Sequence, residues 1–140
     1  MNGLIVSGHG TFASGLQSAA KLIAGDQPNV GFVDFLESDS VADLETKFKA
    51  AINKLKDCEG ILFLCDLAGG SPFKTAVLIS AEHPNSVVIG GTNLVMVVDA
   101  AVSKDSFSIK ELKDAAIQSG MDGIKSFQKT ERPKKEGGGI

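Results

Sequence analysis

The apolar pattern of the chain changes repeatedly between short, continuous apolar runs and longer segments with an apolar residue every three or four positions. Short apolar runs are typical of buried strands, and the longer spacing is typical of amphipathic helices. Strands that alternate with helices form βαβ units around a mostly parallel sheet with helices on both faces. The sequence therefore predicts an α/β fold of three α/β/α layers, and its 140 residues suit one domain.

Four strands are expected, at about residues 2–6, 30–35, 60–65 and 86–89. The run 60–65 is apolar throughout, which indicates a strand buried on both faces. The run 30–35 is polar at Asp34, which a position near an edge of the sheet would explain. A further brief strand is expected at 124–127. The domain then spans 1–128, and the charged, glycine-rich tail 129–140 is expected to be disordered because it has almost no apolar side chains to bury.

The ends of the helices follow from their capping residues. Two serine–acid pairs have the spacing of a helix capping box: Ser40 with Asp43, and Ser108 with Glu111. Ser71 is expected to cap the third helix, with Pro72 in its first turn, where a missing N–H costs nothing. Gly120 is expected to end the last helix. Lysines of the second helix, among them Lys47, are expected on its solvated face.

Charge and cysteine usage exclude several classes of protein. A net charge of −3 and a pI near 5.3 argue against binding to nucleic acid or to anionic membranes. Cys58 and Cys65 flank one short predicted strand at too great a separation for a disulfide, so both are expected to be reduced. The first residues have neither the basic segment nor the long apolar stretch of a signal peptide or membrane span. The expected location is the cytoplasm.

Residues that carry chemistry gather at the carboxyl ends of two predicted strands. His9 stands between Gly8 and Gly10 after the first apolar run, and Asp66 follows the third run just before Gly69–Ser71. Each feature alone has an ordinary explanation. His9 could be a histidine at a turn, Asp66 could cap a helix, and Gly69–Ser71 could be an ordinary capped turn. If the two strands are neighbours, an imidazole, a carboxylate and a glycine-rich turn meet at the edge where open α/β sheets place their sites.

A division of roles follows from this arrangement. Asp66 is expected to accept an N–H from the imidazole of His9, which fixes the tautomer and leaves the other ring nitrogen free. The backbone N–H groups of Gly69 and Gly70, with the hydroxyl of Ser71, would stand at a helix N-terminus and suit a phosphate. The sequence therefore predicts a phosphate site beside a histidine.

Other chemistries fit these residues less well. One histidine and one aspartate fall short of the ligands that zinc requires, so no metal site is expected. A serine hydrolase would use Ser71, His9 and Asp66, but Phe73 stands where the nucleophile elbow needs glycine, and Pro72 lacks the N–H of an oxyanion hole. A phosphate-binding loop for nucleotides is missing. What remains is phosphoryl transfer on His9 itself, without a cofactor.

Three segments resemble the IIA domain of the mannose family of the sugar phosphotransferase system: Ser7–Gly10, Asn29–Phe35, and Leu62–Asp66 with Gly69–Phe73. The resemblance covers about residues 1–128 and implies a parallel sheet of order 2-1-3-4. It also implies a homodimer in which a C-terminal strand is exchanged. His9 would accept a phosphoryl group from the histidine phosphocarrier protein and pass it to a IIB subunit, which serves a IIC/IID membrane permease.

One position departs from the family pattern. Leu67 stands where many relatives have a residue able to form a hydrogen bond, so Ser71 and the backbone must do more of the anchoring. IIB is expected on a separate polypeptide, and a IIA protein never touches the sugar, so mannose, fructose, sorbose and amino sugars all fit. Two alternatives remain open: the phosphoryl donor subunit of the dihydroxyacetone kinase, and a non-catalytic flavodoxin-like binding module.

Overall fold

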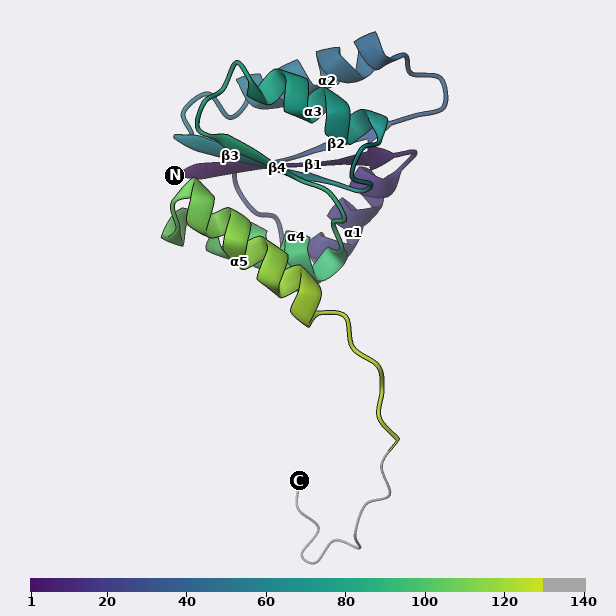
Figure 1. Ribbon diagram of the computed structural model, residues 1–140, viewed down its shortest axis with the longest axis vertical. Helices are drawn as coiled ribbons and strands as arrows, with labels where there is room; N and C mark the ends of the chain where they lie inside the picture. Colours follow the sequence, from purple (N-terminus) through teal and green to yellow (C-terminus); the bar gives the residue numbers. More distant parts are fainter. Residues whose placement is uncertain (130–140) are drawn as a thin grey trace, which may run out of the picture.

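The computed structural model describes residues 1–129, in which four parallel strands form one sheet of order β2-β1-β3-β4 (Figure 1). The strands are β1 (Asn2–His9), β2 (Val30–Phe35), β3 (Gly60–Cys65) and β4 (Ser86–Ile89). The α/β class and the strand order are confirmed, and β2, which carries Asp34, is an edge strand. Apart from Lys129, the tail expected to be disordered lies outside the described residues.

The helices cover both faces of the sheet. Those of residues 1–129 are α1 (Phe12–Ala24), α2 (Val41–Asn53), α3 (Ser71–Ser80), α4 (Leu94–Ser103) and α5 (Ile109–Asp122), with the short 3₁₀ helix η1 (Lys104–Ser106). Helices α2 and α3 lie on one face, and α1, α4 and α5 lie on the other (Figure 1). Within these residues, no helix is long and apolar enough to cross a bilayer.

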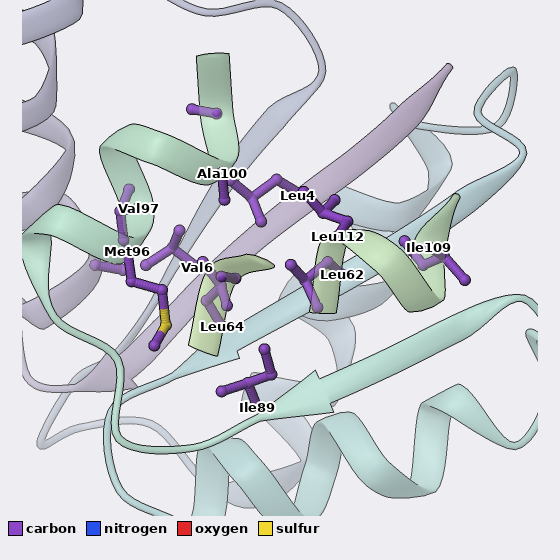
Figure 2. Close-up of a cluster of buried hydrophobic side chains, with 13 residues drawn as sticks. Leu4, Val6, Leu62, Leu64, Ile89, Met96, Val97, Ala100, Ile109 and Leu112 are labelled. Atoms are coloured by element: carbon purple, nitrogen blue, oxygen red, sulfur yellow. The ribbon is translucent and has the colours of Figure 1, made fainter. Parts of the chain in front are cut away.

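Each face of the sheet has its own apolar cluster. Successive side chains of a strand point to opposite faces, so Leu4 and Leu62 pack under α4 and α5 (Figure 2), whereas Ile5 and Phe63 pack against α2 and α3. Every residue of β3 is buried, as its apolar run predicts. Both clusters hold the central strands β1 and β3 rigidly, which fixes the position of whatever follows them.

Strand β1 is longer than predicted. It continues past Val6 to His9, because Ser7 and Gly8 still pair with β2. Ser7 is fully buried although it is polar, and its hydroxyl donates a hydrogen bond of 2.8 Å to the carbonyl of Val33. His9 is therefore the last residue of a central strand and not part of a free loop.

The last helix also passes its predicted end. Both predicted capping boxes are present, but α5 continues through Gly120 to Asp122. Gly120 is buried, and a Cβ atom there would lie 2.5 Å from Cε of Met96. The glycine thus allows α5 to pack closely on α4, and it does not end the helix.

Lys47 is only partly solvated, because 36% of its side chain is exposed and its ammonium is paired. Its ammonium lies 2.6 Å from Oδ2 of Asp39 and 3.2 Å from the carbonyl of Asp34 on the outer edge of β2. The hydrogen bond from Lys47, supported by the N–H of Leu36, lowers the pKa of the Asp39 carboxyl. Lys47 therefore fastens the end of β2 to α2.

The strand expected at 124–127 does not form in the single chain. Residues 124–129 have no regular structure and lead away from the body after α5 (Figure 1). Ile124 and Phe127 are 78% and 88% exposed. Because the segment has no sheet edge beside it, pairing would require a second molecule.

Candidate functional site

The backbone around His9 is held on both sides. The N–H of His9 donates to Oδ2 of Asp66 at 2.8 Å, and the N–H of Gly10 donates to the carbonyl of Phe35 at 2.7 Å. Gly10 has φ +58°, in the left-handed region that favours glycine, so the chain turns sharply into α1. A side chain on Gly8 would collide with the ring of Phe12. The two glycines therefore serve different purposes, one conformational and one steric.

The structure brings the imidazole of His9 and the carboxyl of Asp66 into contact. Nδ1 lies 2.7 Å from Oδ2 of Asp66, and Oδ1 of the same carboxyl accepts the N–H of Leu67 at 2.7 Å. The His9 side chain is 48% exposed, whereas that of Asp66 is 16% exposed. The ring also packs edge-on against Phe35, with the ring centres 6.0 Å apart.

The protonation of the pair follows from the surroundings of the carboxyl. Burial raises the pKa of Asp66, but the hydrogen bonds from the backbone and ring of His9 and from the N–H of Leu67 outweigh burial and lower the pKa overall. An ionised carboxylate only accepts hydrogen bonds, so Nδ1 must carry the ring proton. In the neutral ring, Nε2 then holds the free lone pair.

The free side of the ring lies against the start of α3. A Cβ atom on Gly70 would lie 2.8 Å from Cε1 of His9 and 3.5 Å from Nε2. Gly70, and not Ser71, is the N-cap of this helix, so that prediction is wrong by one residue. Gly69 adopts φ +84° and turns the chain so that the carbonyl of Gly70 accepts the first helical N–H, from Lys74.

The first turn of α3 has backbone N–H groups that make no hydrogen bond within residues 1–129. Gly70 donates its N–H to the carbonyl of Leu67 at 3.0 Å, and Pro72 has no N–H. Within residues 1–129, the N–H groups of Ser71 and Phe73 donate to no acceptor. Sequence reasoning named Ser71 but missed Phe73, although the third residue of a helix always has an N–H without a helical partner. These donors suit an anion.

The other helices that begin at this edge of the sheet are already capped. Asp34 accepts the N–H of Ser14 in α1 at 2.9 Å, Ser40 caps α2, and Asn93 accepts the N–H of Met96 in α4 at 3.1 Å. Helix α3 has no side-chain cap. Among the helices that follow strands β1 to β4, α3 is therefore the one in which no side chain accepts an N–H group of the first turn.

The turn after β4 is hydrogen-bonded to the backbone of the segment that carries Asp66. The N–H of Gly91 donates to the carbonyl of Asp66 at 2.9 Å, and that of Thr92 donates to the carbonyl of Cys65 at 3.1 Å. A Cβ atom on Gly90 would lie 2.6 Å from Cα of Ala68, so glycine is needed for this close approach. No sequence motif pointed to this contact.

Two further features bear on the chemistry. Within residues 1–129, no group of three or more His, Cys, Asp or Glu residues is placed to hold a metal ion. Cys58 and Cys65 are both free thiols, and burial raises the pKa of Cys65, directly before Asp66, to about 12. A thiol that stays protonated is a poor nucleophile, which leaves the imidazole as the reactive group of this corner.

Known proteins are similar to this chain over most of its length. A family model described as "PTS system fructose IIA component" matches residues 3–117. The mannose-specific EIIAB component of Escherichia coli is 34% identical over 126 residues, which are 89% of this chain and 39% of that protein. The chain thus spans well under half the length of this relative.

Two solved structures are similar over nearly their whole length. The phosphotransferase system component EIIA of Streptococcus agalactiae superposes with a TM-score of 0.81 at 33% identity, covering 90% of this chain and 97% of that one. A mannose/sorbose-specific IIA subunit of Enterococcus faecalis gives a TM-score of 0.85 at 26% identity, covering 94% and 98%.

Proposed function

Because this chain belongs to the mannose family of IIA components of the sugar phosphotransferase system, a group of phosphotransferases, we propose that His9 is its phosphoryl acceptor. The donor is the histidine phosphocarrier protein, and the group passes on to a IIB subunit that serves a membrane permease. The observation that carries this proposal is the imidazole of His9, bound to Asp66 through Nδ1 while Nε2 lies beside the uncapped start of α3.

The transfer step needs no external reagent. The lone pair on Nε2 of His9 attacks the phosphorus of a phosphoimidazole on the donor. A new N–P bond forms as the donor's N–P bond breaks, and the electron pair of the broken bond returns to the donor nitrogen. His9 keeps its Nδ1 proton throughout. The ring becomes positively charged, and the Asp66 carboxylate, 2.7 Å away, stabilises that charge.

The phosphoryl oxygens would then meet α3. They carry negative charge in the transition state and in the product, and the protein stabilises this charge mainly by positioning donors. The free N–H groups of Ser71 and Phe73, the hydroxyl of Ser71 and the helix dipole are the donors that this corner offers. Gly70 contributes space for the ring, and Gly69 contributes the turn.

The test is to incubate the protein with phosphoenolpyruvate, enzyme I and the phosphocarrier, and to locate the label by mass spectrometry. We expect one phosphate, stable in base and labile in acid, on the peptide that contains His9. Addition of IIB should then remove it. Acid-stable label on Ser71 would contradict the proposal, and a protein that takes up no phosphate would favour the non-catalytic binding module.

Replacing Gly70 with alanine is expected to slow phosphorylation of His9 by about 10²-fold. The added methyl group would lie 2.8 Å from Cε1, so the ring must tilt away from α3. Gly15→Ala in α1 is the matched control, because a Cβ there meets nothing within 4 Å. Stopped-flow or rapid-quench transfer would measure both. Equal rates for the two variants would show that the ring does not depend on this contact.

The chain is also proposed to form a homodimer through its segment Ile124–Phe127. A groove of about 440 Å³ lies between β4 and α5, lined in part by Val88, Ile89, Ile117 and Met121. Strand β4 is an edge of the sheet with unpaired backbone groups. The exposed segment of a second copy would supply a strand for this edge and apolar side chains for the groove.

The double substitution Ile124→Asp and Phe127→Asp is expected to weaken the dimer by roughly 100-fold, because a buried charge at each position has no partner. Both side chains are exposed in the single chain, so the fold of each subunit should persist. Sedimentation equilibrium would compare this variant with Leu22→Asp, an 89% exposed position on α1. An unchanged dimer would place the contact elsewhere, and a monomeric wild type would exclude the dimer.

A further inference from the structure

The imidazole of His9 touches a second side chain besides Asp66. The hydrogen bond at Nδ1 holds one atom of the ring and does not by itself fix the ring's tilt, and 48% of the side chain is exposed. Phe35, the last residue of β2, is the direct partner of His9 in the strand register. The two rings form a T-shaped pair with centres 6.0 Å apart and planes at 63°, a favourable geometry for aromatic rings. Phe35 therefore limits how far the imidazole can tilt.

Phe35 lies at a weakly supported point of the sheet. β2 is an edge strand, so the backbone groups on its outer side have no neighbouring strand. On its inner side, the carbonyl of Phe35 accepts the N–H of Gly10 at 2.7 Å. The Phe35 side chain is a partly buried neighbour of the apolar cluster on the face of α2 and α3. The end of an edge strand held on one side only would fray, and the Phe35 ring would then move away from the imidazole.

An ion pair binds the backbone on both sides of Phe35. The ammonium of Lys47 donates to the carbonyl of Asp34, directly before Phe35, at 3.2 Å. Oδ2 of Asp39 accepts the N–H of Leu36, directly after Phe35, at 2.8 Å. Lys47 and Asp39 are themselves 2.6 Å apart, and the Asp39 side chain is only 13% exposed. The ion pair therefore joins the two residues that flank Phe35 and prevents the end of β2 from fraying.

We propose that Phe35 is a positioning residue for His9. The ion pair of Lys47 and Asp39 keeps Phe35 in place from the outer edge of β2. The proposal rests on the proposed function and deepens it. The lone pair of Nε2 must point at the phosphorus atom, and a ring tilted away from that line reacts slowly. Asp66 fixes the proton on Nδ1, whereas Phe35 fixes the tilt of the ring. An ion pair that touches no reacting group thus sets how often His9 is aligned for transfer.

The test replaces Phe35 with leucine, which fills similar apolar space but has no ring to face the imidazole. Wild type and Phe35→Leu receive phosphate from the phosphorylated carrier protein over a range of concentrations, and separately from phosphoramidate, a small donor that needs no docking surface. With the carrier, we expect kcat to fall about tenfold while KM stays within about twofold of the wild-type value. With phosphoramidate, the rate should fall by the same factor, because either donor requires an aligned Nε2.

Phe32→Leu is the matched control on the same strand. Phe32 is also partly buried, but it packs against the apolar cluster on the opposite face of the sheet. Its register partner in β1 is Val6 and not His9. This variant should lose a similar amount of thermal stability and keep the wild-type rates with both donors.

Loss of the ion pair should act only through Phe35. Lys47→Met keeps an unbranched side chain of similar length and leaves the carbonyl of Asp34 without its ammonium partner. We expect this variant to slow transfer about threefold with either donor. In the double variant with Phe35→Leu, the rate should equal that of Phe35→Leu alone, because the ion pair then has no ring to hold in place.

Nuclear magnetic resonance provides a readout that does not depend on activity. In the wild type, the ring protons of Phe35 and His9 should show a nuclear Overhauser contact, and Lys47→Met should weaken it. The ring nitrogen shifts of His9 should show the proton on Nδ1 in the wild type, in Lys47→Met and in Phe35→Leu, since Asp66 still accepts that proton. This result would separate the tilt of the ring from its tautomer.

Several results would overturn the proposal. Wild-type rates in Phe35→Leu would show that the ring contact does not align Nε2, and an equal loss of rate in Phe32→Leu would assign the loss to general destabilisation. A change confined to KM for the carrier would assign Phe35 to contact with the donor. Losses that multiply in the double variant would separate Lys47 from the positioning of His9.

Failure of the proposed function would give a different result. Wild-type protein would then take up no phosphate from either donor. The resonance measurement would still report whether Lys47 holds Phe35 against His9.

Discussion

Replacing His9 with glutamine is expected to abolish phosphoryl transfer to this protein while leaving it folded. Glutamine is polar and close in size to histidine, and its amide can still donate a hydrogen bond toward Asp66. Its nitrogen, however, has no lone pair available for attack on phosphorus. Because the chemistry requires a nucleophilic nitrogen, the loss should be complete and not partial. The loss is measured as the transfer of labelled phosphate from the phosphorylated carrier protein to the variant.

The chain provides its own control for this experiment, because it contains two histidines. His83 follows α3 at the opposite edge of the sheet, so His83→Gln should be phosphorylated at the wild-type rate. Label that persists in the His9 variant and disappears in the His83 variant would move the acceptor to His83. Label in both variants would point to a residue other than histidine.

Much of the fold was predictable because its signals are local. The serine–acid pairs that begin α2 and α5 satisfy each other within one turn of the helix, so their spacing alone indicates the caps. The apolar run of β3 likewise reports a strand buried on both faces. Alternation of such strands with helices leaves few topologies, and the parallel α/β sheet is among them.

Two of the predictions that failed depend on partners far away in the sequence. Strand β1 passes Val6 because the hydroxyl of Ser7 finds the carbonyl of Val33, 26 residues further on. Gly120 lies within α5 because Met96 packs against it. In the sequence alone, a serine followed by a glycine resembles the end of a strand, and a glycine after a helical apolar pattern resembles the end of a helix. Only tertiary contacts reverse both interpretations.

The candidate site also combines a feature that local sequence signals predict with one that depends on distant contacts. The contact between His9 and Asp66 was predictable because both follow apolar runs, and the carboxyl ends of neighbouring parallel strands meet at one edge. That α3 alone lacks a cap at this edge was not predictable. The cap of α1 comes from Asp34 on β2, whereas Thr11, the N-cap residue of α1, makes no side-chain capping hydrogen bond.

The ionisation of Asp66 sets the pH range in which the site is assembled. Its pKa is lower in the folded protein than in the unfolded chain. The carboxylate therefore contributes its full stabilisation above the ordinary carboxyl pKa, and this contribution is lost as the pH falls through the lowered value. Near neutral pH the carboxylate is ionised throughout, so any pH dependence of transfer there arises from other groups.

Replacing Asp66 with asparagine is expected to slow transfer through His9 by roughly 10²- to 10⁴-fold, while the free energy of unfolding falls by only about 1–2 kcal/mol. Oδ2 of Asp66 accepts two N–H groups of His9, and Oδ1 accepts that of Leu67. An amide has one oxygen, so its NH₂ group must face either the donors of His9 or that of Leu67. The variant also lacks the negative charge that stabilises the positively charged ring.

Asp34→Asn is the matched control for this substitution, because Asp34 is another carboxylate that accepts a backbone N–H at the same edge of the sheet, from Ser14. It should lower stability by a similar amount and change the transfer rate only a few-fold. Rapid-quench transfer and thermal melts of both variants provide the comparison. If both lost rate in proportion to stability, Asp66 would act only as a structural cap. A selective loss of rate in Asp66→Asn would instead follow from its contact with the ring, since that contact is what the two carboxylates do not share.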